Sequence, residues 1–121
     1  MLTQPSVLIV DQSEDSREVL RTALQRRGLQ TFEASQPQRG LELARQYHPR
    51  VIVLDLEVET GDGDDLCGQF TRASRSDHLV VLGSARLRRD AGGEGTITGR
   101  QFVSKPYHYG TLIRKIEELI G

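Results

Sequence analysis

This sequence has almost no cysteine, no long apolar run and no clear excess of charge of one sign. It holds one cysteine in 121 residues, which argues against a fold held together by disulfides and favours a reducing compartment. No apolar run is long enough to cross a bilayer, and no charged segment followed by an apolar one opens the chain. We therefore expect a soluble, cytoplasmic protein with no membrane contact.

The net charge gives no sign of a polyanionic partner. The formal charge is −1, from 16 basic and 17 acidic residues, so the chain as a whole has no electrostatic reason to bind nucleic acid. Internal repeats, linkers and low-complexity tracts are also absent from the sequence. With 36% apolar residues, the chain fits a single domain, 1–121, built around one core.

Five short apolar runs, rich in β-branched residues, alternate with segments of helical periodicity. Apolar runs without polar alternation are typical of parallel strands that are buried on both faces. The alternation predicts an α/β fold, in which a doubly wound parallel sheet is connected by right-handed crossovers. The predicted strands are residues 6–11, 29–34, 51–54, 79–84 and 102–105.

The first two predicted helices have recognisable ends. Ser13 suits the N-cap of the first, and Gly28 suits the left-handed position at its end. The second helix is predicted to open at Ser35, with Pro37 in its first turn, and to stop before Pro49. The predicted apolar face of the first helix consists of Val19, Leu20, Ala23 and Leu24.

The later helices differ in how clearly they are marked. The third is predicted to begin at Asp64 and Asp65, with Cys67 on its buried side as a packing residue. Four glycines in residues 92–99 argue against a full fourth helix, because each costs about 1 kcal/mol relative to alanine. We expect about five helices, the fourth short or irregular. The last has the clearest apolar stripe, formed by Leu112, Ile113, Ile116, Leu119 and Ile120.

Polar residues stand at the ends of several predicted strands. Asp11 ends the first, and Asp55 follows the third, with Gly63 eight positions on. The segments concerned are V-L-I-V-D up to Asp11, V-L-D up to Asp55, L-G-S-A at 82–85 and F-V-S-K-P at 102–106. In this order and spacing they resemble the receiver domain of bacterial two-component response regulators, over essentially the whole chain. The resemblance implies a CheY-like, flavodoxin-like sheet of five strands in the order 2-1-3-4-5.

The resemblance implies a role for each of these polar residues. Asp55 corresponds to the phosphoacceptor, a carboxylate nucleophile that forms an aspartyl phosphate. Lys105 corresponds to a mobile positive charge on the phosphoryl oxygens, and Ser84 to a hydroxyl that hydrogen-bonds them. Phe102 occupies the aromatic switch position, which links the acceptor to an output surface. Taken alone, Ser84 also suits a polar strand end, and Phe102 a core side chain that does not switch.

The sequence departs from the family pattern at position 12. The family ends its first strand with two adjacent acids, the second of which binds Mg²⁺ directly, whereas this chain has Asp11 and Gln12. At an effective dielectric near 20, one missing charge a few Å from the cation is worth about 4 kcal/mol before desolvation. The resemblance therefore implies a weakened Mg²⁺ site formed by Asp11, Asp55 and Glu57. Gln12 stands there in place of the usual second acid.

Three functional hypotheses follow. The first is a receiver that accepts a phosphoryl group on Asp55 from a histidine kinase or phosphotransfer protein and switches a face that binds a downstream protein. The second is a pseudo-receiver that binds proteins without phosphorylation. Gln12 and the irregular fourth helix favour this hypothesis. The third is an enzyme or nucleotide binder on the same sheet. It is the weakest, because no strand is followed by a G-x-G-x-x-G or Walker sequence, and we expect no enzyme.

The chain ends directly after its last predicted helix. We therefore expect no DNA-binding output domain and no direct contact with nucleic acid. On this interpretation the protein either acts by protein contact alone or is a piece of a longer regulator. The sequence predicts neither the cognate kinase nor the oligomeric state.

Overall fold

A parallel sheet organises the computed structural model, which describes residues 5–55, 63–74, 78–83, 100–104 and 107–120. Within these residues the strand order is β2-β1-β3-β4-β5, and every neighbouring pair is parallel. The parallel α/β sheet and its order agree with the sequence prediction. The strands are β1 (Ser6–Val10), β2 (Gln30–Ala34), β3 (Val51–Asp55), β4 (Leu79–Gly83) and β5 (Arg100–Ser104).

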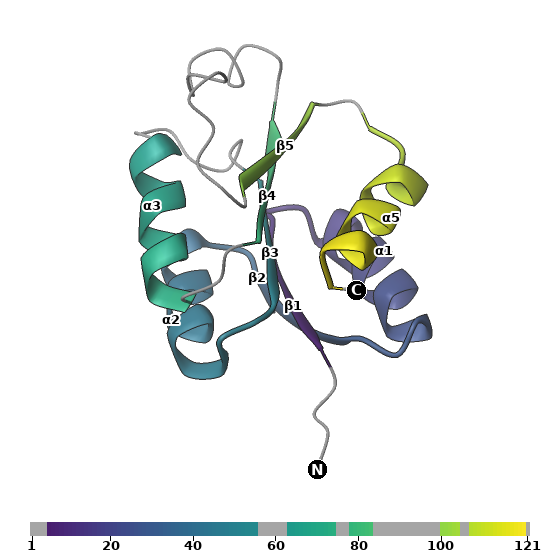
Figure 1. Cartoon of the computed structure of the whole chain (residues 1–121), viewed down its shortest axis with the longest axis horizontal. Coiled ribbons are helices and arrows are strands. Elements are labelled where there is room, and N and C mark those ends of the chain that lie inside the picture. Colours follow the sequence, from purple (N-terminus) through teal and green to yellow (C-terminus); the bar gives the residue numbers. More distant parts are fainter. Residues whose placement is uncertain (1–4, 56–62, 75–77, 84–99, 105–106, 121) are drawn as a thin grey trace.

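Helices cover both faces of the sheet. Figure 1 shows α2 and α3 on one side of the strands and α1 and α5 on the other. The predicted irregular fourth helix falls on residues 84–99, outside the described residues. None of the helices in the described part of the chain is long and apolar enough to cross a membrane. The helices are α1 (Glu14–Arg26), α2 (Pro37–Tyr47), α3 (Gly63–Ser74) and α5 (Tyr109–Ile120).

The strand residues are shared between two apolar clusters. Successive side chains of a strand point to opposite faces, so Leu8 and Val10 of β1 join the cluster under α2 and α3. Val7 and Ile9 join the cluster under α1 and α5. Every residue of β3 and β4 is buried, as expected for strands covered on both faces. Cys67 is also buried, which confirms its predicted place in the core.

The first helix matches its predicted ends but not its whole predicted face. The hydroxyl of Ser13 accepts a hydrogen bond from the Ser16 amide at 3.2 Å, and Gly28 has the left-handed φ of 81°. The prediction that Val19 belongs to the buried face is wrong, because its side chain is 44% exposed. At 100° per residue, Val19 lies a quarter turn from Leu20, which is fully buried against the sheet.

The second helix begins one residue later than predicted. Its N-cap is Gln36, not Ser35, and no side-chain hydrogen bond caps it. Pro37 occupies the first helical position, where its fixed φ and missing N–H carry no cost, and this position sets the start of the helix.

Helix α2 approaches the sheet closely at one glycine. A Cβ added to Gly40 would lie 2.8 Å from Cγ2 of Val10 and 3.0 Å from Cζ of Phe70. Glycine therefore permits α2 to pack directly onto β1 and against α3.

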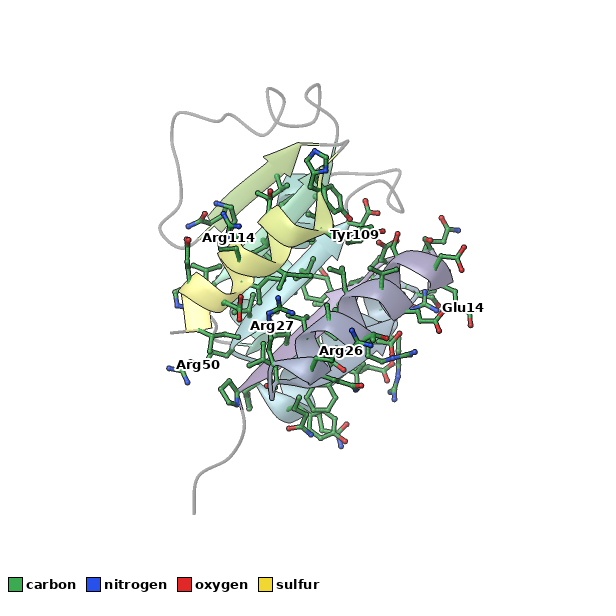
Figure 2. All side chains as sticks on the ribbon, turned by 90° about the vertical axis from the view of Figure 1, so that its right-hand side faces the viewer. Glu14, Arg26, Arg27, Arg50, Tyr109 and Arg114 are labelled. Atoms are coloured by element: carbon green, nitrogen blue, oxygen red, sulfur yellow. The ribbon has the colours of Figure 1, made fainter. Side chains whose placement is uncertain are left out.

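Helices α1 and α5 lie side by side on their face of the sheet (Figure 2). Arg27 and Glu117 form an ion pair across this contact, with Nε and Oε2 3.1 Å apart. At the other end, the hydroxyls of Tyr109 and Ser16 are 3.2 Å apart. The buried residues of α5 are Leu112, Ile113 and Ile116, while the predicted Leu119 and Ile120 are partly buried.

Candidate functional site

Asp55 is the last residue of the central strand β3. Its side chain is only 4% exposed, although carboxylates are seldom buried unless they are paired or bind a cation. Strand β3 lies between β1 and β4, so Asp55 reaches the carboxyl edge in the middle of the sheet. In open α/β sheets this edge is where ligands bind.

Asp11 follows directly after β1 and is buried to the same extent, 4% exposed. Its amide donates to the carbonyl of Ala34 at 3.0 Å, which extends the contact between β1 and β2 by one residue. Its Oδ1 accepts a hydrogen bond from the Ser13 amide at 2.9 Å. The carboxylate is thus held at a defined angle in the turn before α1.

The strand register brings the two carboxylates to neighbouring positions. Val10 pairs with Leu54, so the next residues along these two strands are Asp11 and Asp55. Two buried negative charges at one edge repel each other and favour a bound cation. The register therefore puts these two predicted site residues at adjacent positions on one edge of the sheet.

Gln12 follows Asp11 and is exposed. Its main chain is held by Arg17 of α1, whose Nη1 donates to the carbonyls of Asp11 at 2.6 Å and of Gln12 at 3.3 Å. The side chain of Arg17 is only 16% exposed, so it belongs to the framework of the turn.

Two tyrosines stand at the start of α5: Tyr109 is its first residue, and Tyr107 lies two residues before it. The rings of Tyr107 and Tyr109 meet edge to face, with centroids 5.6 Å apart. Burial is the main reason why the pKa of the Tyr107 phenol is raised above its ordinary value. Tyr109 and then the charges of Asp11 and Asp55 raise it further. The Tyr107 hydroxyl therefore lies within the electrostatic reach of both carboxylates.

A family model for the response regulator receiver domain matches residues 7–117 of the chain. The chain belongs to this family. The match spans all the described strands from Val7 onward and includes both buried carboxylates. The resemblance inferred from the strand-end residues is thereby confirmed.

Curated relatives of this receiver fall into two length classes. The KDP operon transcriptional regulatory protein KdpE of Escherichia coli is 35% identical over 114 residues, covering 88% of this chain and 47% of that protein. The transcriptional regulatory protein YxdJ of Bacillus subtilis is 27% identical over 114 residues, covering 94% and 49%. This chain therefore spans about half the length of KdpE and YxdJ. The polar-differentiation response regulator DivK of Brucella ovis is 23% identical over 118 residues, and 96% of each chain is covered.

Solved structures share the fold of this receiver. A two-component response regulator from Clostridium difficile matches with a TM-score of 0.80 and 20% identity, covering 97% of this chain and 96% of that one. Chemotaxis protein CheY4 from Vibrio cholerae matches with a TM-score of 0.78 and 19% identity, covering 97% and 99%.

The acidic pair of the receiver fits Mg²⁺. This ion usually takes one or two carboxylates and keeps several of its waters, which is the donor set that Asp11 and Asp55 offer. Within the part of the chain that the structure describes, no cluster of three or more histidine, cysteine or acidic side chains forms. The third predicted ligand, Glu57, lies outside that part. Gln12 brings an amide oxygen in place of a charge.

The side chains of three other predicted site residues lie outside the part of the chain that the structure describes. Ser84 and Lys105 lie outside the described residues. Phe102 is in β5, with its backbone paired to Val81, and its side chain is not described. Ser84 and Lys105 directly follow Gly83 and Ser104 in the sequence, and these two residues are paired at the ends of β4 and β5.

Arg17 and Tyr107 were not among the predicted site residues. Tyr107 stands two residues after Lys105, and this short separation could have indicated that it lies near the site. Arg17 stands four residues after the N-cap Ser13, the spacing at which a helical side chain can turn back toward the preceding turn. Basic residues in a first turn are unusual because the helix dipole favours acids there, and this conflict was the available hint.

Proposed function

We propose that this receiver accepts a phosphoryl group on Asp55 from a phosphohistidine of a histidine kinase or phosphotransfer protein. A carboxylate oxygen of Asp55 attacks phosphorus, the P–N bond breaks, and the leaving imidazole keeps the electron pair. The product is an acyl phosphate. The observation that supports this function is the pair of buried carboxylates, Asp11 and Asp55, at the carboxyl edge of a receiver-family sheet. The domain acts as a signalling receiver, not as an enzyme.

Asp11 and Asp55 would hold Mg²⁺, with Gln12 and the side chain of Glu57 as further oxygen donors. The ion, when bound, neutralises negative charge on the phosphoryl oxygens. Asp11 carries this role through a carboxylate that the Ser13 amide already orients. The near-complete burial of both acids excludes most bulk water, which strengthens their attraction for a cation.

Lys105 and Ser84 complete the proposed site as contacts of the phosphoryl group. A lysine ammonium is a compact charge on a flexible stem and can follow the oxygens during transfer. Phe102 is the proposed switch residue that reports the change at Ser84 to an output surface. The pairing of β4 with β5, which carry these residues or directly precede them, supports this arrangement.

The proposed output is a contact with a downstream protein, made in the cytoplasm. KdpE and YxdJ are named as transcriptional regulatory proteins, and this chain spans about half of each. For the receiver itself we propose no direct contact with nucleic acid, because the formal net charge of the chain is −1.

The test is intact-mass spectrometry after incubation with acetyl phosphate and Mg²⁺. We expect the wild type to gain the mass of one phosphoryl group and Asp55→Asn to gain nothing. Omitting Mg²⁺ should abolish the gain. A wild type that stays unmodified by acetyl phosphate and by histidine kinases with Mg²⁺ contradicts the proposal.

Gln12 favours a second candidate, a pseudo-receiver that binds its partner without phosphorylation. An amide cannot replace the charge of the second acid, so the metal affinity of the site is expected to be reduced. The same experiment separates the two candidates. If only Gln12→Asp becomes labelled, the natural chain is a pseudo-receiver with an otherwise intact site.

A further inference from the structure

Arg17 of α1 contacts the turn between β1 and α1, which contains Asp11 and Gln12. One of its nitrogens, Nη1, donates to the carbonyl of Asp11 at 2.6 Å and to the carbonyl of Gln12 at 3.3 Å. Its Nε faces Oε1 of Glu33 at 3.4 Å. One guanidinium thus connects the turn to β2.

Glu33 is a fixed anchor for this guanidinium. It lies in β2, where it pairs with Ile9 of β1. Its second oxygen, Oε2, is held by Nη1 of Arg21 at 2.7 Å, and only 25% of its side chain is exposed. Because a planar guanidinium offers several donors in a rigid fork, Arg17 can bind the carboxylate and the carbonyls at once.

These contacts determine the backbone geometry of Gln12. The carbonyls of Asp11 and Gln12 belong to the two peptide planes on either side of Gln12. Holding both planes holds φ and ψ of Gln12, and therefore the direction in which its Cα–Cβ bond leaves the chain. An uncharged ligand lacks the long-range attraction of a carboxylate, so its contribution to a metal site depends more on being placed beforehand.

We propose that Arg17 is a positioning residue that presets the amide of Gln12 as a ligand for Mg²⁺ at the Asp11–Asp55 pair. The proposal rests on the proposed function. As a bare charge, Arg17 acts in the opposite direction, since a cation near the site repels Mg²⁺. Removal of Arg17 therefore distinguishes the two effects: loss of positioning lowers the Mg²⁺ affinity, whereas loss of charge repulsion raises it.

The experiment is a calorimetric titration of the full chain with Mg²⁺. We expect Arg17→Met to weaken Mg²⁺ binding about tenfold or more, the range found when residues that orient metal ligands are removed. Arg17→Lys keeps the positive charge but loses the planar set of guanidinium donors, so its loss of Mg²⁺ affinity should be intermediate. If Mg²⁺ binds Arg17→Met as well as the wild type or better, Arg17 acts only as a charge and the proposal is overturned.

Arg21 offers a matched control. Arg21→Met removes a cation from the same Glu33 carboxylate. Within the described residues, the hydrogen bond and ion pair of Arg21 go to Glu33 and not to the turn, so the Mg²⁺ affinity of this variant should stay within about twofold of the wild type. An equal loss in Arg21→Met and Arg17→Met would trace the effect to the general contact of α1 with β2 and overturn the proposal.

A double-mutant cycle tests whether Arg17 acts through Gln12. In a Gln12→Ala background the ligand is gone, so Arg17→Met should cost no further Mg²⁺ affinity. A full additional loss in that background would mean that Arg17 supports the site by another route, against the proposal.

Amide hydrogen exchange in metal-free protein gives a readout that needs neither Mg²⁺ nor phosphorylation. The Ser13 amide, bonded to Oδ1 of Asp11 at 2.9 Å, should exchange faster in Arg17→Met and unchanged in Arg21→Met. A wild type that binds no Mg²⁺ overturns the proposed function together with the ligand role of Gln12. A wild type that binds Mg²⁺, beside an Arg17→Met variant with unaltered affinity and exchange, overturns the positioning role alone.

Discussion

Asp11 and Asp55 leave neighbouring strands at the same level, each one residue beyond a directly paired position, and each is 4% exposed. Most acidic residues of a small domain are solvated, and two that are buried side by side carry an electrostatic cost. A cation bound between them would offset that cost, so we expect metal binding at this pair to stabilise the folded receiver.

Mg²⁺ should raise the melting temperature of the wild type and fail to do so for Asp11→Asn. A ligand at 100 times its Kd stabilises the folded state by about 2.7 kcal/mol. The asparagine keeps an oxygen that can accept from the Ser13 amide, so the variant loses the charge and retains the hydrogen bond. Asp15→Asn, an exposed acid in the first turn of α1, is the control and should keep the full thermal shift. An undiminished shift in Asp11→Asn would show that Mg²⁺ binds elsewhere.

Gln12→Asp should tighten Mg²⁺ binding by at least about tenfold, a modest part of the roughly 4 kcal/mol expected for one charge before desolvation. Labelling by acetyl phosphate should also become faster. Gln12→Asn shortens the side chain without adding charge and should bring no gain. Equal Mg²⁺ affinity in wild type and Gln12→Asp would mean that position 12 does not contribute to the metal site.

Gly40→Ala and Gly68→Ala should change stability in opposite directions. Alanine at 40 would place a Cβ 2.8 Å from the buried Cγ2 of Val10, and overpacking of this kind costs about 1–3 kcal/mol. At 68 the nearest atom is Nη1 of Arg72 at 3.2 Å, the end of a side chain that can move aside. The second variant should therefore gain up to about 1 kcal/mol of helix propensity. Urea unfolding measures both, and equal stabilisation of the two would contradict the close packing of α2 on β1.

Tyr107→Phe should remove part of the loss of stability in alkali. Burial raises the pKa of Tyr107 in the folded state, so above the unfolded value near 10 the native protein retains a proton that the unfolded chain has lost. The stabilisation of the folded state by the Tyr107 phenol is fully present below the unfolded pKa. It is lost as the pH rises through the folded pKa. The limit is about 1.4 kcal/mol per pH unit, and solvent screening of this half-buried phenol lowers it. Urea unfolding at pH 9 and pH 11 should show a smaller decline in the variant, whereas parallel declines would contradict the assignment.

The parallel strands, and the acids at the ends of two of them, were predictable because both depend on short-range patterns. Apolar runs such as the one before Asp55 define parallel strands, and parallel strands bring their carboxyl ends to one edge. The strand order 2-1-3-4-5, which puts Asp11 next to Asp55, came from the family resemblance and not from these patterns.

The contacts and exposure of individual side chains were not predictable from these patterns. The contacts of Arg17 depend on the backbone of the turn after β1, which no periodicity encodes. Val19 was assigned to the buried face because it recurs at helical spacing with Ala23, but it lies 100° around the helix from the fully buried Leu20. Ser35 is a good capping residue, but the helix begins at Pro37 and its N-cap is Gln36, because proline favours the first helical position.

Site mapping of the phosphoryl group tests the central claim most directly. After labelling with acetyl phosphate and Mg²⁺, reduction with borohydride converts an aspartyl phosphate to homoserine, which tandem mass spectrometry locates in the sequence. We predict homoserine at position 55 and unchanged aspartate at position 11. Homoserine at position 11, or at neither position, would contradict the assignment of Asp55 as the acceptor.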